Sequence, residues 1–380
     1  MSIERPVRQQ NQGLSKNRTD GMGNNGEVRT LLKGRNTLKL RGQGNWSTSI
    51  NKEVAQTADF NFVTFAQDPV YIASNNALLD KSFGEFAPDN GFIHLDVGGG
   101  TGLVVQESIK IAEQKGKRGR FIMVEPDEFA ITSAFETTPE SENASVAFIQ
   151  GVGQEIEKLV RQEINLAQID TASIHDAIHE IRGINNKRAT IRGIIALLKP
   201  GGTLSINSAF TSIAQQDPGY GRWKFGAIKR SGGRRIRTKR EEPLSFEYAK
   251  SEETAGEKGK LETIDQDDTK TAILQPQDYI DLLTLPESEG GLGLELISAG
   301  SESLPISQSA LEGIAHYPRF AEGFFEDVEF DDGRVVTITD KINFTSDAVS
   351  DIQPRDGRIQ LPRNWYNIIV RKPLELPHVV

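Results

Sequence analysis

Short apolar runs alternate with segments of helical length along the middle of the chain. Runs rich in β-branched and aromatic residues predict five strands, at 92–97, 120–125, 146–150, 171–175 and 203–209. The segments between them space their apolar residues as amphipathic helices do, at 102–115, 126–137, 154–165 and 184–198. This alternation predicts an α/β fold with a doubly wound, mostly parallel sheet. Right-handed crossovers would bring the carboxyl ends of the strands to one edge, where such sheets bind ligands.

The flanking segments predict a larger sheet and a cap. Residues 52–86 space aromatic and leucine residues as one or two helices would, and a turn should lead into the first strand. A helix at 276–285 and strands at 293–298 and 365–370 would complete a seven-stranded sheet. We therefore expect a helical cap at 51–90, a core at 91–210, a charged insertion at 211–275 and the end of the sheet at 276–380, with a cap insertion at 299–363.

The first 50 residues do not share this patterning. Residues 1–45 contain nine Lys/Arg and three acidic residues, and the first part of this segment lacks aromatic residues. A segment with so few apolar positions buries too little surface to offset its ordering entropy. We predict a flexible basic leader at 1–50, with a docking arm for an acidic partner as the alternative.

Composition narrows the class of protein. The chain has no cysteine and a net charge of −9, which excludes disulfides and thiolate chemistry and disfavours a general nucleic-acid binder. There is no apolar run long enough to span a membrane and no signal-like N-terminus. We therefore expect a cytoplasmic protein that does not bind membranes.

The first predicted strand ends in the stretch "LDVGGGTG" at 95–102. Glycines at 98, 99, 100 and 102 lack Cβ atoms, so a ligand can lie against the backbone in front of the following helix. Such turns serve dinucleotides and adenosyl cofactors alike. Asp96 favours the second class, because a carboxylate at this place suits a positively charged cofactor and repels a pyrophosphate.

Three further motifs follow in order. Glu125 ends the second strand in "VEPD", where a carboxylate can accept hydrogen bonds from both ribose hydroxyls. The third strand ends in "FIQG", and "LLKPGG" turns a helix into the fifth strand. Together with the glycine turn, these motifs resemble the class I S-adenosylmethionine-dependent methyltransferases over roughly residues 90–210.

This resemblance implies a Rossmann-like seven-stranded sheet with one antiparallel strand near its edge. It also implies S-adenosyl-L-methionine as cofactor and S-adenosyl-L-homocysteine as product. The residues expected to bind the cofactor are Asp96, Gly98, Gly99, Gly100, Gly102, Glu125, Pro126, Gln150, Gly151, Val152 and His175. Many relatives carry an aspartate where Val152 stands, so Gln150 or the backbone at 151–152 would have to bind the adenine.

The fourth strand leads into "SIHDAIHEI", the densest titratable cluster of the chain. In this family the segment faces the methyl group, so His175, Asp176 and His179 are candidate catalytic residues. A histidine oriented by a carboxylate could take a proton from a hydroxyl or an amine. The alternative is that His175 packs beneath the cofactor while His179 and Glu180 cap or solvate a helix. We expect no metal site, since no third ligand follows at a useful spacing.

Several residues outside the core are candidates for the substrate site. These are Tyr71, Trp223, His316 and Tyr317, each of which could equally be ordinary core, and Tyr220 is a further lid candidate. Seven cations lie within 229–240 and could steer an anionic substrate or RNA, although such runs are more often solvated loops.

The sequence thus predicts methyl transfer to an O, N or C atom of a small molecule. The Asn/Asp-Pro-Pro-Tyr/Phe signature, which in related enzymes grips a planar amino group on a nucleobase or glutamine, is absent, and this disfavours amino-methylation of DNA. One alternative is an RNA or protein methyltransferase that uses the basic insertion. Another is a non-catalytic, adenosyl-binding regulatory partner. A homodimer is compatible with all three. A nicotinamide oxidoreductase is disfavoured, because the chain lacks a convincing Tyr-x-x-x-Lys catalytic pair and Asp96 is poorly placed for a pyrophosphate.

Overall fold

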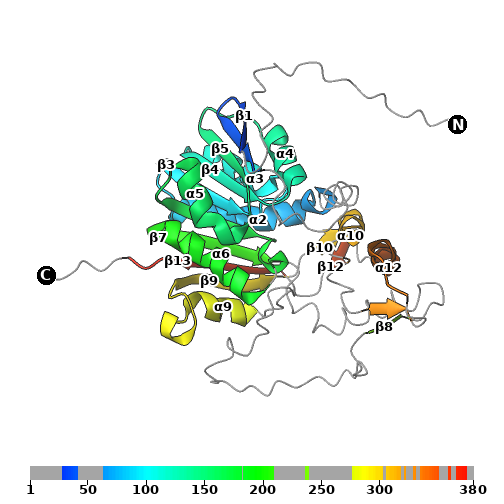
Figure 1. Cartoon of the computed structure of the whole chain (residues 1–380). Helices are drawn as coiled ribbons and strands as arrows, with labels where there is room; N and C mark the ends of the chain where they lie inside the picture. The colour runs from blue at the N-terminus through cyan, green and yellow to red at the C-terminus, as the bar shows by residue number, and fades with distance from the viewer. Residues whose placement is uncertain are drawn as a thin grey trace, which may run out of the picture.

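The computed structural model describes residues 28–41, 63–181, 183–208, 236–238, 276–302, 305–317, 321, 328–330, 334–350, 358–360 and 365–374. Their main feature is one nine-stranded sheet with helices on both sides (Figure 1). The strand order is β1-β2-β5-β4-β3-β6-β7-β13-β9. The expected α/β fold with a mostly parallel sheet is confirmed.

The seven predicted strands are all present, with small shifts at their ends. They are β3 (Asn90–Val97), β4 (Arg118–Glu125), β5 (Ala144–Gln150), β6 (Ile169–His175), β7 (Leu198–Ser208), β9 (Glu295–Glu302) and β13 (Trp365–Arg371). The first five pair in parallel, whereas β13 runs antiparallel to both of its neighbours, β7 and β9.

The other two strands correct the expectation for the N-terminal segment. Within the predicted flexible leader, β1 (Arg29–Lys33) and β2 (Asn36–Leu40) form a hairpin, and β2 extends the sheet beside β5. Leu38 and Leu40 are buried, so alternate positions of "NTLKL" supply a core face that the charge count concealed. The prediction of a flexible leader is therefore wrong for residues 29–40, and the sheet has nine strands rather than seven.

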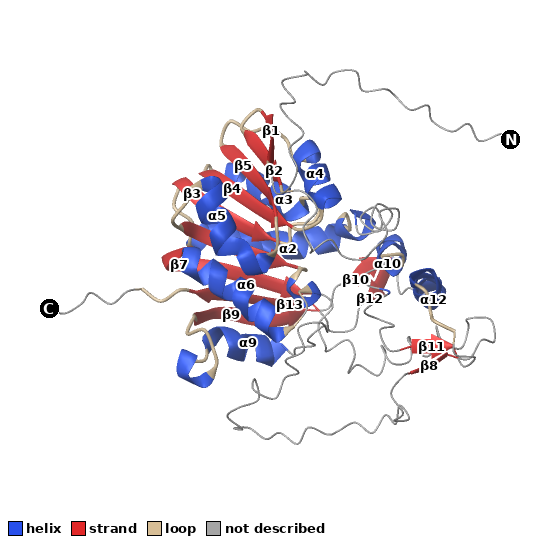
Figure 2. Ribbon diagram, viewed as in Figure 1, coloured by secondary structure: helices blue, strands red, loops and turns tan. Residues whose placement is uncertain are grey.

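Helices cover the sheet on two faces, as Figure 2 shows. One apolar core joins the strands to α2 (Pro69–Glu85), α3 (Leu103–Gln114) and α4 (Glu128–Thr137). The other joins them to α5 (Ile156–Ile164), α6 (Ile184–Leu197) and α9 (Pro276–Thr284). Short 3-10 turns lie at η1 (Gly153–Glu155), η2 (Ile178–Glu180) and η4 (Glu287–Glu289). None of the described helices has the length and apolarity that a bilayer crossing requires.

A smaller cap lies beside the carboxyl edge of the sheet. Its described elements are β10 (Pro305–Ser307), α10 (Gln308–Ala315), β11 (Val328–Phe330), α12 (Ile338–Ser350) and β12 (Arg358–Gln360). β10 pairs with β12, and β11 pairs with β8 (Ile236–Thr238) from the predicted charged insertion, most of which lies outside the described residues. The Asp68 carboxylate caps α2 and also accepts the Ser307 amide at 2.8 Å, which ties the cap to α2.

The two faces of the central strands differ sharply in chemistry. Towards α5 and α6, strands β3, β6 and β7 present apolar side chains, namely Leu95, Val97, Ala172, Ile174, Leu204 and Ile206. The alternate positions are buried and polar: His94, Asp96, Thr171, Ser173, His175, Thr203, Ser205 and Asn207. Because neighbouring residues of a strand point to opposite faces, these eight lie on the α2 side. We call them the polar face.

Candidate functional site

The glycine turn joins β3 to α3 at the carboxyl edge of the sheet. Gly98, Gly100 and Gly102 all have positive φ, which only glycine adopts without strain. The Gly98 amide donates to the Val124 carbonyl at 2.8 Å and so anchors the turn to β4. Gly102 is the N-cap residue of α3, and no side chain caps the helix there. The first backbone amides of α3 can therefore donate to an anionic group.

The glycines of this turn have different tasks. A Cβ on Gly98 would lie 2.6 Å from the Cβ of Ala177, and one on Gly102 would lie 2.8 Å from that of Ala134. A Cβ on Gly99 would lie 2.7 Å from Oδ2 of Asp96. At Gly100, by contrast, the added atom would meet nothing within 4 Å. Three glycines therefore permit close packing, and Gly100 is the one whose missing side chain opens onto space.

Two buried carboxylates flank the turn. Glu125 accepts the Gly100 amide on Oε2 and the Asp127 amide on Oε1, both at 3.0 Å. A carboxylate can accept about four hydrogen bonds, so this arrangement is compatible with further hydroxyl donors.

Asp96 is 1% exposed; its Oδ1 accepts the Ser173 hydroxyl at 2.7 Å, and its Oδ2 has no hydrogen-bond partner among the described residues. Burial raises the pKa of Asp96 to about 7, with the charge of Glu125 adding to the rise. These two neighbouring acidic side chains would stabilise a positively charged group bound beside them.

The end of β5 is engaged by the N-terminal hairpin. The Gln150 side chain accepts the Arg41 amide at 3.0 Å and donates to the Pro126 carbonyl at 3.4 Å. The Gly151 amide donates to the Glu125 carbonyl, and a Cβ on Gly151 would collide with Leu159. Val152, in extended conformation, follows at the start of η1. Gln150 and Gly151 are thus hydrogen-bonded to the end of β4 that carries Glu125, and the Gln150 side chain is engaged by Arg41.

The end of β6 carries the predicted catalytic cluster. His175 is 4% exposed, its Nε2 lies 3.0 Å from the Ser205 hydroxyl, and its Nδ1 is buried without a partner among the described residues. Burial lowers the pKa of His175 to about 3. His175 is therefore neutral at physiological pH and lies in the polar face, beneath the edge of the sheet.

Asp176 adopts an unusual backbone conformation with φ of 52°. Its amide is held at 2.9 Å by the Asn207 side chain, which in turn donates to Asn75 of α2 at 2.8 Å. Strained residues that are fixed from several sides are frequent at functional sites. The Tyr71 hydroxyl hydrogen-bonds to the side chains of Asn75 and Asp176, and its pKa is raised by burial and by the charge of Asp176.

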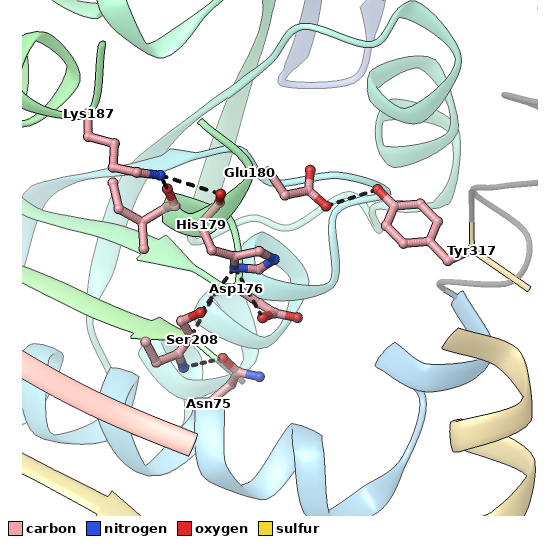
Figure 3. A network of polar contacts seen from close by, with 9 residues as sticks. Asn75, Asp176, His179, Glu180, Lys187, Ser208 and Tyr317 are labelled. Atoms are coloured by element: carbon pink, nitrogen blue, oxygen red, sulfur yellow. Dashed lines mark hydrogen bonds and ion pairs between the residues drawn. The ribbon is translucent and has the colours of Figure 1, made fainter. Parts of the chain in front are cut away.

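His179 lies next to Asp176 in the network of polar contacts drawn in Figure 3. Its Nδ1 lies 3.0 Å from the Ser208 hydroxyl and 3.8 Å from Oδ1 of Asp176. Its side chain is 20% exposed, against 1% for Asp176. Burial lowers the pKa of His179 to about 4, Glu180 opposes this shift, and Lys187 adds to it.

Two residues hold the turn that carries His179. Lys187 of α6 is fully buried, and its ammonium donates to the carbonyls of Ile178 and Ile181 at 2.5 Å. On the cap side, the Tyr317 hydroxyl donates to Glu180 at 3.1 Å, as Figure 3 shows. Sequence reasoning missed Lys187, since one lysine on a helix gives no signal, whereas Tyr317 was among the candidates.

The remaining candidates lie elsewhere. His316 is exposed, and its Nδ1 lies 2.7 Å from the Glu312 carbonyl. Trp223, Tyr220 and nearly all of the basic run 229–240 fall outside the described residues. Within the part of the chain that the structure describes, no group of three His, Asp or Glu side chains could hold a metal ion.

Comparisons with known proteins give one family match and several similar solved structures. Residues 95–204 match a family model described as a methyltransferase domain. No curated protein sequence matches the chain.

Similar solved structures include loganic acid methyltransferase with SAH, at 11% identity and a TM-score of 0.46, over 81% of this chain and 95% of that one. A Methanosarcina mazei protein described as a SAM-dependent methyltransferase has 12% identity and a TM-score of 0.39, over 77% and 97%. The N-methyltransferase NodS of Bradyrhizobium japonicum has 10% identity and a TM-score of 0.38, over 81% and 98%. Over residues 95–204 the chain is therefore similar to a methyltransferase domain.

Proposed function

We propose that this chain transfers the methyl group of S-adenosylmethionine to an O, N or C atom of a small-molecule acceptor. The observation that carries the proposal is the cover over the end of β6. Tyr71 of α2 and Tyr317 of the cap both bond to the turn at 176–180, and they are 2% and 9% exposed. An acceptor reached beneath two such side chains is more easily a small molecule than a polymer.

The residues of the turn fit the cofactor. Gly100 offers backbone beside open space, and the uncapped start of α3 offers amide donors for a carboxylate. Glu125 would accept the ribose hydroxyls, and Asp96, with its unpartnered oxygen, would face the positive charge. When bound, the cofactor supplies an electrophilic methyl group on a sulfonium. Gly98, Gly99 and Gly102 would shape the turn for it.

For the adenine we propose the backbone of Gly151 and Val152 rather than the Gln150 amide. The Gln150 side chain already serves Arg41 and Pro126. Its role would then be to fix the end of β5 against the N-terminal hairpin.

Among the catalytic candidates, we propose His179 as the group that takes a proton from the acceptor. It is neutral at pH 7 because burial lowers its pKa, and it is more exposed than Asp176. Asp176 would orient the ring and stabilise the imidazolium that forms. His175, neutral and bonded to Ser205, would line the floor of the site.

Three basic residues of the N-terminal hairpin give an RNA acceptor no support. Lys33, Arg35 and Lys39 of the hairpin donate to backbone carbonyls of Glu136, Glu142 and Glu163. These cations are engaged by the domain itself.

The test is a methyl-transfer assay with methyl-labelled S-adenosylmethionine and the full chain. We expect label in a member of a panel of small hydroxyl, amine and activated-carbon compounds, and at least a tenfold loss of turnover in His179→Ala with cofactor affinity retained. Label found only in RNA or protein would overturn the proposal, as would cofactor binding without turnover on any acceptor.

A further inference from the structure

The polar face contains a hydrogen-bonded chain that leads to the Asp96 carboxylate. His94 of β3 is fully buried, and its Nδ1 lies 2.9 Å from the Thr171 hydroxyl. Its Nε2 lies 3.1 Å from the Ser173 hydroxyl, which donates to Oδ1 of Asp96 at 2.7 Å. None of these links is local in sequence, since His94 and Thr171 are separated by 77 positions.

Counting hydrogens fixes the direction of this chain. An ionised carboxylate only accepts, so Ser173 must give its single hydrogen to Asp96. Ser173 must then accept from Nε2 of His94, and Nδ1 must accept from Thr171. A neutral imidazole carries one hydrogen, and the buried His94 is neutral, because burial and the neighbouring His175 lower its pKa to about 3. With Asp96 ionised, every hydrogen in the chain therefore points toward the carboxylate.

Protonation of Asp96 would remove this constraint. The carboxylic acid could donate to Ser173, Ser173 could donate to Nε2, and the hydrogen of His94 could reside on Nδ1 facing Thr171. The tautomer of His94 is thus tied to the charge of Asp96 through one serine. The hydrogen bond from Ser173 to the ionised carboxylate is charge-assisted, and donation from Nε2 of His94 to Ser173 strengthens it in the low-dielectric interior.

We propose that His94 is a positioning residue for the cofactor site: through Ser173 it holds the Asp96 carboxylate ionised and oriented beneath the glycine turn. This inference rests on the proposed cofactor site and names a residue outside it. The other oxygen of Asp96 lies 2.7 Å from the position of a Cβ on Gly99 and has no partner among the described residues. The chain therefore fixes one oxygen and leaves the second beneath the turn.

The environment of Asp96 makes such support necessary. Burial opposes its ionisation, and the charge of Glu125 on β4 adds to this effect. The charge of Asp96 in turn helps to raise the pKa of Tyr71 on α2, which is therefore a neutral neighbour. His94 and His175 are both neutral and supply no compensating charge. The Ser173 hydrogen bond is the interaction that favours the ionised form.

The first test measures cofactor affinity against pH by calorimetry, with S-adenosylmethionine, on the full chain from pH 5.5 to 8.5. We expect the wild-type affinity to rise as Asp96 ionises. His94→Phe and Ser173→Ala should weaken binding about tenfold at pH 7 and move the midpoint of the rise to higher pH. His94→Gln, which keeps a donor for Ser173, should restore most of the affinity.

Thr203→Val is the matched control. Thr203 belongs to the same polar face, but its hydroxyl lies 3.4 Å from Ser82 and has no link to Asp96. It should change stability and leave the pH midpoint of binding in place. An equal loss of affinity at every pH in His94→Phe, or the same shift in Thr203→Val, would overturn the proposal.

The second test needs neither cofactor nor acceptor. Nitrogen-15 NMR of the histidine rings should show His94 as the Nε2–H tautomer above the titration of Asp96 and a change as the pH falls through it. Ser173→Ala should abolish this coupling. A His94 tautomer that ignores the charge of Asp96 would refute the inference, whereas an absent methyl acceptor would refute only the proposed function.

Discussion

The two faces of strands β3, β6 and β7 are buried to the same extent, but one carries apolar side chains and the other carries polar ones. Towards α5 and α6 the alternate side chains are aliphatic and pack into one core. Towards α2 they include two histidines, an aspartate and five hydroxyl or amide side chains. A parallel sheet with both faces covered ordinarily carries apolar residues on both. We propose from this difference that one face of these strands serves stability and that the other serves the candidate site at their carboxyl ends.

The polar face is also the face on which burial works against the ionised groups. Burial shifts the pKa of Asp96 upward and the pKa values of His94 and His175 downward, so each tends to be neutral inside the protein. Proteins keep such groups where function needs them, and pKa shifts of this kind cluster at active sites. Substitutions on each face test this contrast.

The largest expected effect is on the apolar face. Ile174→Ala should lower the free energy of unfolding by about 2–5 kcal/mol, because it leaves a cavity beneath fully buried neighbours. Ser205→Ala, on the adjacent strand and the polar face, should cost less than about 2 kcal/mol. Urea unfolding of both variants measures the difference. Equal losses would mean that the polar face contributes to stability as the apolar face does.

Substitutions at two glycines of the turn should have the next largest effects. Gly100→Val should weaken cofactor binding at least about 100-fold, or about 2.7 kcal/mol, because its side chain enters the open space. Gly98→Val should chiefly destabilise the fold, because its side chain collides with Ala177. Calorimetry and thermal unfolding separate the two outcomes. Retained affinity in a folded Gly100→Val protein would place the cofactor elsewhere.

The stability of the protein at acidic pH should depend on His94. His94 has a pKa of about 3 when folded and about 6.5 when unfolded, so its contribution is present above pH 6.5 and is lost as the pH falls. The stability gap between wild type and His94→Phe should therefore narrow by about 2 kcal/mol between pH 6.5 and 5. Denaturant titrations at the two pH values measure it. A gap that is constant or widens in acid would show that His94 is charged in the fold.

The smallest expected change is at Glu125. Glu125→Ala should weaken cofactor binding about tenfold, or about 1.4 kcal/mol, through the loss of the ribose acceptor. The protein should stay folded, although the amides of Gly100 and Asp127 lose their shared acceptor. An unchanged affinity would show that the ribose assignment is wrong.

Much of this arrangement follows from the sequence. The alternation of apolar runs and helical segments predicted the parallel strands, and the Gly98–Gly102 turn and Glu125 were located by residue type and spacing. The hairpin at 29–40 was missed because the basic residues around it concealed the short alternation in "NTLKL". In addition, β2 pairs with β5, a partner distant in sequence that no local pattern records.

The polar face was missed for a different reason. The alternation in "IHLDV", "TASIH" and "TLSINS" is visible in the sequence, but these runs served only to locate strands. A period of two in strands that a parallel sheet should bury completely is a signal of buried polar function. Which partners those side chains find, such as Ser173 for His94, depends on strand register and cannot be derived from one strand alone.

The measurement that tests this account most directly is made on Asp96→Asn, which keeps the size of the side chain and an acceptor for Ser173. Affinity for S-adenosylmethionine is measured by calorimetry at pH 8, and stability by thermal unfolding at the same pH. We predict opposite signs, with binding weakened about tenfold or more and stability increased, because a buried charge that opposes folding is removed. Unchanged affinity together with reduced stability would mean that Asp96 is an ordinary structural residue, and would contradict the functional assignment of the polar face.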